Sequence, residues 1–299
     1  MISIGNLAVG GRGKTPLVAH VVSTLLAAGE RPSILTRGYG RLDAADIVVV
    51  RDADGMRADL RRSGDEPLML ARRLPGAVVV AGTDRHAAGR LAETRFRCTV
   101  HVLDDGFQHL RLHRSVDLVC VAPQDFASPV TLPGGRLRES LDALDAATAV
   151  IAFGDVDPVA LPAGTRVWRA RRALEPARLV DHVERTVTPC TGSVVALAGI
   201  AAPERFFDDL RGLGWPLSRT LAFRDHHPYT RSDVDRIVSV AREEGAAMLV
   251  TTEKDVVRLL PYRPLPLPLA FVPMSVSLDK PADFDRWLLT VLAASRKAA

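Results

Sequence analysis

A glycine-rich segment near the start of the chain constrains its fold more than any other feature. Gly10–Thr15 reads Gly-Gly-Arg-Gly-Lys-Thr, between a predicted strand over Ile2–Ile4 and a predicted helix over Thr15–Ala28. A glycine loop that joins a strand to a helix lets backbone N–H groups and the helix N-terminus face an anion such as phosphate. The segment therefore predicts a phosphate-binding loop within an α/β fold.

The loop departs at one position from the strict motif G-x-x-x-x-G-K-[ST], because Ala8 stands where the first glycine is expected. We interpret it as a variant loop whose flexibility comes from the neighbouring glycines. Lysine would reach the β- and γ-phosphates, and the threonine hydroxyl would bind Mg²⁺. Only four of the 39 basic residues are lysines, which favours this interpretation over a glycine turn with an exposed lysine. The candidate nucleotide-binding residues here are Gly10, Gly11, Gly13, Lys14 and Thr15.

The rest of the chain alternates short apolar runs with helical patterns, as a parallel sheet with crossover helices does. Residues 116–122 are almost entirely apolar, which indicates a strand buried on both faces. Prolines accumulate after residue 154, and a second strand–helix set follows residue 192. We predict a P-loop NTPase-type parallel sheet with flanking helices in residues 1–154. A linker with a possible strand pair (155–191) and a smaller α/β domain (192–299) would follow.

Composition excludes several classes of protein. The 299 residues are 47% hydrophobic and 25% charged, which is ordinary for a globular protein, and no apolar run approaches the ~18 residues of a membrane span. No basic segment followed by an apolar one marks a signal peptide at the start. Cys98, Cys120 and Cys190 lie far apart, which predicts reduced thiols and argues against a disulfide framework or a thiolate zinc site.

The charge balance also limits the partners. A net charge of +4 is modest, the arginines are dispersed, and aromatic residues make up only 5%, so nucleic-acid binding is not expected. The balance is compatible with an anionic substrate or an anionic membrane surface.

Acidic residues follow a second apolar strand. The strand predicted over residues 99–103 runs directly into Asp104 and Asp105. P-loop enzymes use such acids at a strand end to hold Mg²⁺, although Asp-Gly after a strand is also common in turns. Asp65, before a helix, and the pair His226-His227 are further candidates for proton transfer from an acceptor hydroxyl. Helix capping and solvated histidines remain the alternatives for these residues.

Together these motifs resemble the tetraacyldisaccharide 4′-kinases, which phosphorylate a disaccharide lipid of the lipid A pathway with ATP. The resemblance rests on seven segments that occur in this order from residue 9 to residue 255: VGGRGKTP (9–16), TRGYG (36–40), GDEP (64–67), DDGFQH (104–109), LRE (137–139), DH (225–226) and TEKD (252–255). The combination of DDGFQH with TEKD is specific to this family among P-loop proteins.

The resemblance implies roles for individual residues. Lys14 and Thr15 match the P-loop lysine and the magnesium-binding threonine. Asp65 matches a carboxylate that acts as catalytic base, paired with a histidine that His226 matches, and closure between the two halves would assemble this dyad. The remaining matches are the acidic metal pair Asp104 and Asp105, the residues beside it, Gln108 and His109, and a charged pair near the nucleotide, Arg138 and Glu139.

The family usually carries a further segment ahead of the P-loop strand, with a hydrophobic or basic helix that rests on the inner membrane. The resemblance implies that this segment is missing ahead of Met1, and that membrane docking is weaker without it. The expected partners are a lipid A disaccharide precursor and the cytoplasmic face of the bacterial inner membrane, bound peripherally, with ATP and Mg²⁺ as cofactors. Oligomeric state stays open. The alternative is a P-loop kinase or regulatory NTPase that acts on a soluble small molecule or a protein.

Overall fold

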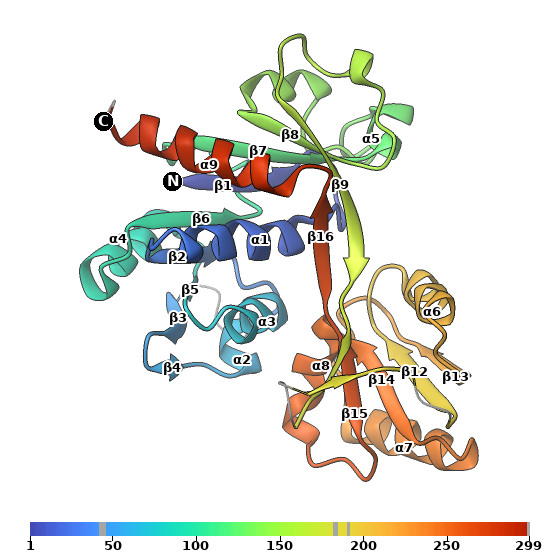
Figure 1. Ribbon diagram of the computed structural model, residues 1–299. Coiled ribbons are helices and arrows are strands. Elements are labelled where there is room, and N and C mark those ends of the chain that lie inside the picture. Colours follow the sequence, from blue (N-terminus) through green and yellow to red (C-terminus); the bar gives the residue numbers. More distant parts are fainter. Residues whose placement is uncertain (42–45, 182–184, 190–191, 298–299) are drawn as a thin grey trace. The chain divides into compact units, whose positions relative to one another are not determined.

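A computed structural model describes residues 1–41, 46–181, 185–189 and 192–297 (Figure 1). The chain forms two compact units, Met1–Ala173 with Ser275–Ala299 (unit 1) and Leu174–Met274 (unit 2). These boundaries differ from the predicted ones, since the structure assigns 155–173 and the C-terminal helix to unit 1. Packing explains the difference, because Phe284 of that helix is fully buried and contacts Trp168 edge to face at 5.4 Å.

Unit 1 is built on a ten-stranded sheet in the order β16-β9-β8-β7-β1-β6-β2-β5-β3-β4. The strands from β9 to β5 in this order run parallel, and β3 and β4 join antiparallel at one edge. The strands are β1 (Ile2–Asn6), β2 (Pro32–Thr36), β3 (Val48–Asp52), β4 (Gly55–Met56), β5 (Val78–Ala81), β6 (Val100–Asp104), β7 (Val116–Val121), β8 (Ala149–Phe153), β9 (Val167–Leu174) and β16 (Met274–Leu278).

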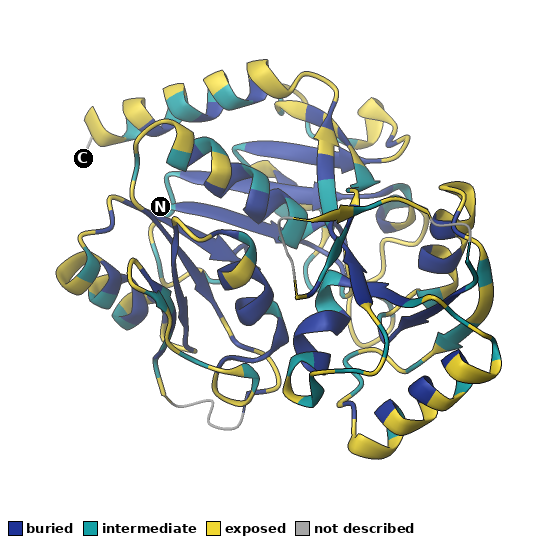
Figure 2. Ribbon diagram, turned by 60° about the horizontal axis from the view of Figure 1, so that its bottom comes forward, coloured by how far each residue is buried: buried dark blue, intermediate teal, exposed yellow. Residues whose placement is uncertain are grey.

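Apart from the C-terminal helix, which follows β16, the helices of unit 1 lie between these strands along the chain. They are α1 (Lys14–Ala27), α2 (Leu60–Ser63), α3 (Asp65–Arg73), α4 (Arg85–Phe96), α5 (Pro123–Ala127) and α9 (Pro281–Lys297), with 3₁₀ turns at Leu141–Ala146 and Pro158–Ala160. The central strands are buried along their whole length, whereas each long helix keeps an exposed side (Figure 2). The predicted α/β fold with a mainly parallel sheet is confirmed.

The strand order places the glycine loop where a ligand is expected. The chain builds the sheet on one side of β1 from β2 to β6, then passes to the other side with β7 and β8. Ligands of parallel α/β sheets bind at the carboxyl ends of the strands, where the order reverses in this way. The loop after β1 lies at this switch point.

Unit 2 holds a smaller mixed sheet in the order β11-β10-β15-β14-β12-β13, whose four strands from β15 to β13 run parallel. Its strands are β10 (Ala177–Leu179), β11 (Thr186–Val187), β12 (Val194–Ala198), β13 (Leu217–Ala222), β14 (Met248–Thr252) and β15 (Leu269–Val272). Its helices are α6 (Pro203–Gly212), α7 (Arg231–Glu243) and α8 (Glu253–Leu259), followed by a 3₁₀ turn at Leu260–Tyr262. Its core gathers apolar side chains of β12, β14, β15 and α6, with Phe207 fully buried.

The thiols that the structure describes are unpaired, as expected. Cys98 and Cys120 are free and buried. Burial raises the pKa of both, to about 11 for Cys98 and about 12 for Cys120, so both stay protonated near neutral pH. Cys190 lies outside the described residues.

Candidate active site

The loop after β1 presents an uncapped helix N-terminus. Gly13 precedes α1 in the left-handed conformation (φ 83°), no side chain caps the helix among the described residues, and its first turn holds no acid. The first N–H groups of a helix have no partner within it, and the helix dipole adds positive charge there. The start of α1 can therefore bind a phosphate group through its backbone.

Substitution of Gly13 by alanine is expected to abolish nucleotide binding. The new Cβ would lie 2.5 Å from Cζ of the Phe153 ring, and alanine is strained at this φ. The loop would have to move away from β8, which would displace the N–H groups at the start of α1. Equilibrium dialysis with ATP measures the loss. Gly164 is the matched control, because it has a similar φ of 79° but nothing within 4 Å of an added Cβ; equal loss in Gly164→Ala would contradict the account.

Lys14, the first residue of α1, is held by two acceptors. Its Nζ donates to Oδ1 of Asn6 at 2.6 Å and forms an ion pair with Asp105 at 3.1 Å. Asn6 is the last residue of β1 and is fully buried. Sequence reasoning missed Asn6, since nothing in the motif marks it. The contact keeps the lysine beside the start of α1, where it can meet the phosphates of a nucleotide.

One arginine of the loop and two from distant segments fix its backbone. Arg12 forms an ion pair with Asp125 of α5, and its Nε lies 3.0 Å from Oδ1 of that carboxylate, with both residues buried. Arg136 donates to the carbonyl of Val9 at 3.2 Å. A further guanidinium, that of Arg172 on β9, donates to the carbonyl of Gly11 at 3.3 Å. Their spacing along the chain gave no signal of these roles.

Asp104 and Asp105 lie at the end of β6, beside β1, and their environments differ. Asp104 is only 4% exposed, and burial raises its pKa to about 7, with a further contribution from Glu66. Burial also acts to raise the pKa of Asp105, but the positive charges of Lys14 and Arg138 outweigh this effect and hold the pKa below its ordinary value. The site thus pairs a carboxylate whose burial outweighs the cations Lys14 and Arg85 with one whose cations, Lys14 and Arg138, outweigh its burial.

The residues near this pair form one polar network. Arg138 Nη1 donates to both carboxylate oxygens of Asp105, at 3.0 and 2.8 Å, and to Gln108 Oε1 at 3.2 Å. The amide of Gln108 donates to the Asn6 carbonyl at 3.1 Å. His109 lies farther along the same loop, where burial and then Arg85 lower its pKa. Four of the predicted site residues, Lys14, Asp105, Gln108 and Arg138, are thereby brought together.

The donor set near Asp104 fits a hard divalent cation. Asp104, Asp105 and the Thr15 hydroxyl offer oxygen ligands alone, which is the preference of Mg²⁺. Glu139 Oε1 is buried and has no hydrogen-bond partner within the described part of the chain. The described residues contain no group of three or more His, Cys, Asp or Glu side chains placed to hold a metal alone. Magnesium that keeps several waters and binds through substrate phosphates needs no such cage.

Asp65 begins α3 and is only 6% exposed. Its Oδ1 accepts a hydrogen bond from the backbone N–H of Glu66 at 2.9 Å. Gly64 before it adopts φ 83°, and a Cβ there would lie 2.5 Å from the carbonyl oxygen of Tyr39. The glycine lets the loop after β2 pass close to the start of α3, which fixes the backbone that carries this carboxylate.

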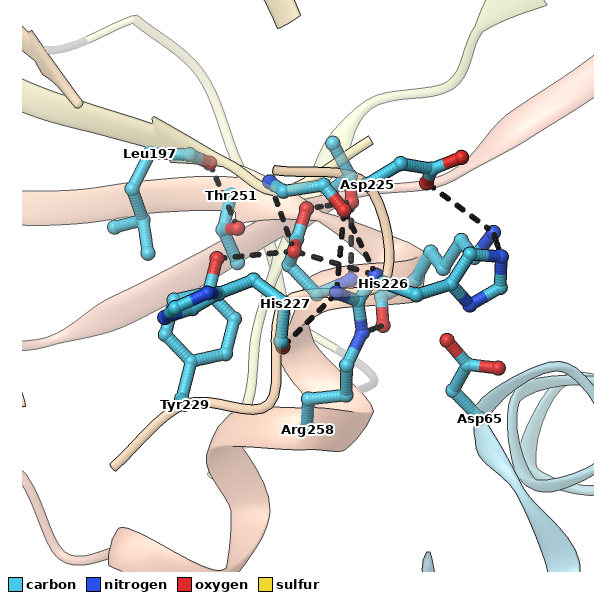
Figure 3. Close-up of polar contacts among 12 residues, drawn as sticks. Asp65, Leu197, Asp225, His226, His227, Tyr229, Thr251 and Arg258 are labelled. Carbon is cyan, nitrogen blue, oxygen red and sulfur yellow. Dashed lines mark hydrogen bonds and ion pairs between the residues drawn. The ribbon is translucent and has the colours of Figure 1, made fainter. Parts of the chain in front are cut away.

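In unit 2, the structure distinguishes the two adjacent histidines. His227 Nε2 donates to Oδ2 of Asp233 on α7 (3.1 Å), and its ring packs against Phe223 and meets Tyr229 edge to face, so its role is structural. His226 instead has φ 56°, and its Nε2 lies 2.9 Å from Nζ of Lys254 (Figure 3). Of the pair, His226 is the candidate for chemistry, as the resemblance implies.

Comparisons with known proteins decide the family. The model of the tetraacyldisaccharide-1-P 4′-kinase family matches residues 1–293. The chain belongs to this family. A tetraacyldisaccharide 4′-kinase of Geobacter metallireducens is 41% identical over 270 residues, which cover 87% of this chain and 79% of the relative. That of Syntrophus aciditrophicus is 34% identical and covers 98% of this chain and 84% of the relative.

A solved structure supports the same assignment. The crystal structure of the family member LpxK from Aquifex aeolicus, in complex with ATP, matches with a TM-score of 0.80 and 29% identity. The match covers 97% of this chain and 87% of that one. The predicted family, fold class and enzyme class are confirmed: this chain is a family member with the fold of a P-loop kinase of lipid A biosynthesis.

Proposed function

We propose that this chain transfers the γ-phosphoryl group of ATP to the 4′-hydroxyl of a tetraacyl disaccharide 1-phosphate. The observation that carries the proposal is the start of α1, an uncapped helix N-terminus with Lys14 beside it, in a chain that matches the kinase family over residues 1–293. Lys14 would exchange its contacts with Asn6 and Asp105 for the β- and γ-phosphates.

Asp104, Asp105 and Thr15 would hold Mg²⁺, which when bound neutralises charge on the phosphates during transfer. Arg138 keeps Asp105 in place through two hydrogen bonds, and Gln108 ties this network to the end of β1. Glu139 and His109 stay candidates for contacts with the nucleotide, as the resemblance implies.

Asp65 would accept the proton of the attacking hydroxyl. Its carboxylate is buried and accepts a hydrogen bond in the first turn of α3, so its orientation is largely fixed. A general base in a water-poor position removes the proton as the new O–P bond forms. His226 is the proposed partner of this base; that pairing rests on the resemblance.

The lipid nature of the acceptor accords with exposed apolar side chains near the loop. Val130 and Leu132 are 47% and 50% exposed, on the segment whose Arg136 and Arg138 pair with the backbone of Val9 and Leu7. No helix of the described residues is long and apolar enough to span a bilayer. We propose peripheral contact of this side of unit 1 with the cytoplasmic face of the inner membrane, where the acyl chains reside.

A panel of acceptors tests the proposal. The purified chain is supplied with ATP and Mg²⁺, and ADP release is followed with tetraacyl disaccharide 1-phosphate in detergent, with soluble sugar phosphates, and with no acceptor. We expect release above background with the lipid alone. Release with a soluble sugar phosphate, or release independent of any acceptor, would instead support the alternative of a kinase or NTPase that acts on soluble partners.

A further inference from the structure

Lys254 is a conspicuous residue that the proposed reaction does not yet use. It is one of four lysines in a chain rich in arginine, and it is the second residue of α8. Its Nζ lies 2.9 Å from Nε2 of His226 and 3.8 Å from Oδ1 of Asp225. The lysine side chain is 21% exposed, so the contact is largely shielded from solvent.

The loop that carries His226 is held rigidly by the same helix. The carboxylate of Asp255 is fully buried and accepts from Gly199 N–H (3.0 Å), Tyr229 Oη (3.0 Å) and Thr252 Oγ1 (2.6 Å) (Figure 3). Arg258, one turn later, donates to the carbonyls of Gly199 at 3.1 Å and His227 at 3.2 Å. Asp255 and Arg258, three residues apart on α8, thus fix the loop, and Lys254 of the same helix lies against the ring.

Close packing around Gly199 completes this support. The N–H of His226 donates to the carbonyl of Gly199 at 3.2 Å, and a Cβ on Gly199 would lie 3.0 Å from Oδ1 of Asp255. The left-handed backbone of His226, which a residue other than glycine adopts at a cost, is therefore imposed by its surroundings. The backbone that carries the imidazole is thereby fixed beside Lys254.

The hydrogen bond between Lys254 and His226 determines which ring nitrogen of the histidine carries the proton. An ammonium group has donors and no acceptor, so Nε2 of His226 must be the accepting nitrogen, and the neutral ring carries its proton on Nδ1. The hydrogen bond made by one ring nitrogen decides which tautomer the other presents. Lysine suits this task because its compact ammonium group can donate to a single ring nitrogen, whereas the planar guanidinium of arginine is shaped to donate two parallel hydrogen bonds.

We propose that Lys254 is a positioning residue, which holds His226 as the neutral Nδ1–H tautomer and fixes the orientation of its ring. The effect on catalysis rests on the proposed function, in which His226 partners the base. The tautomer itself follows from the geometry of unit 2.

The tautomer can be measured in the full-length protein labelled with ¹⁵N-histidine. Long-range ¹H–¹⁵N correlation spectra distinguish a protonated from an accepting ring nitrogen, and His226→Asn assigns the signals. We expect Nδ1 protonated and Nε2 accepting in the native chain. In Lys254→Met, the Nε2–H form should appear and kcat should fall about 10- to 100-fold with KM for ATP little changed. Lys254→Arg should retain part of the native Nδ1–H population and part of the native kcat.

Controls separate positioning from folding. Lys280→Met, at an exposed lysine of unit 1, should change neither the His226 signals nor kcat. The His227 signals report whether the loop of Lys254→Met stays folded. A native Nε2–H tautomer, or one unchanged by Lys254→Met, would overturn the proposal, as would a changed tautomer with unchanged kcat. A native chain without kinase activity would refute the proposed function and leave the tautomer assignment standing.

Discussion

Asp65→Asn is expected to lower kcat by about 10²- to 10⁴-fold while ATP still binds. The asparagine amide has nearly the same shape and can still accept the hydrogen bond from Glu66, but it cannot take a proton from the acceptor hydroxyl. Single-turnover kinetics with saturating ATP and lipid measures the loss of the chemical step. Nucleotide binding is followed separately by calorimetry.

Asp59→Asn is the matched control. Asp59 lies six residues earlier, caps α2 through a hydrogen bond from the Arg62 N–H, and has no part in the proposed chemistry. Asparagine caps helices as well as aspartate does, so activity should stay near the native level. If Asp65→Asn turned over at a rate close to that of Asp59→Asn, Asp65 could not be the base.

Asp104→Asn should lower kcat strongly and at the same time stabilise the protein. Loss of a carboxylate from the proposed magnesium site removes several kcal/mol of charge stabilisation, which corresponds to a fall in kcat of about 100-fold or more. In the absence of metal, the same carboxylate is costly because burial opposes its charge. We expect the free energy of unfolding at pH 8 in EDTA to rise by about 1–3 kcal/mol.

The gain in the free energy of unfolding from Asp104→Asn should increase as pH rises. The pKa of Asp104 is raised from 3.8 to about 7 in the folded chain, so the folded state binds more protons than the unfolded state between these values. Stability from this group is present below pH 4 and is lost as pH rises through 7. Denaturant unfolding of Asp104→Asn should therefore show a smaller decline of stability from pH 5 to pH 8 than the native chain shows.

The adjacent Asp105→Asn provides a control of opposite sign. Lys14 and Arg138 hold the pKa of Asp105 below its ordinary value, so its removal should destabilise the protein at neutral pH. Stabilisation by both substitutions, or destabilisation by both, would contradict the electrostatic account of the pair.

Much of this site could be predicted because local sequence encodes it. The spacing of Gly13, Lys14 and Thr15 between a strand and a helix predicts the phosphate loop, and an acidic pair at a strand end predicts the proposed metal site. Parallel strands bring such ends to one edge of a sheet. These features depend on backbone geometry over a few residues, which a sequence pattern records directly.

The contacts that hold the site depend on residues distant in the chain, and no local pattern marks them. Asn6 meets Lys14, Arg12 meets Asp125, and Arg172 reaches Gly11 from β9. The return of α9 to unit 1 was missed for the same reason, since the burial of Phe284 against Trp168 joins segments over a hundred residues apart. The residue pattern alone did not distinguish His226 from His227, although the resemblance named His226, and the two rings differ in their partners.

The most direct measurement is identification of the product formed from tetraacyl disaccharide 1-phosphate with ATP and Mg²⁺. Mass spectrometry of the extracted lipid should show the gain of one phosphoryl group, and ³¹P NMR should place it on the 4′-oxygen. A Lys14→Met chain that remains folded should give no such product. If the native, ATP-binding chain in detergent left the lipid unphosphorylated, or phosphorylated another oxygen, the proposed reaction would be wrong.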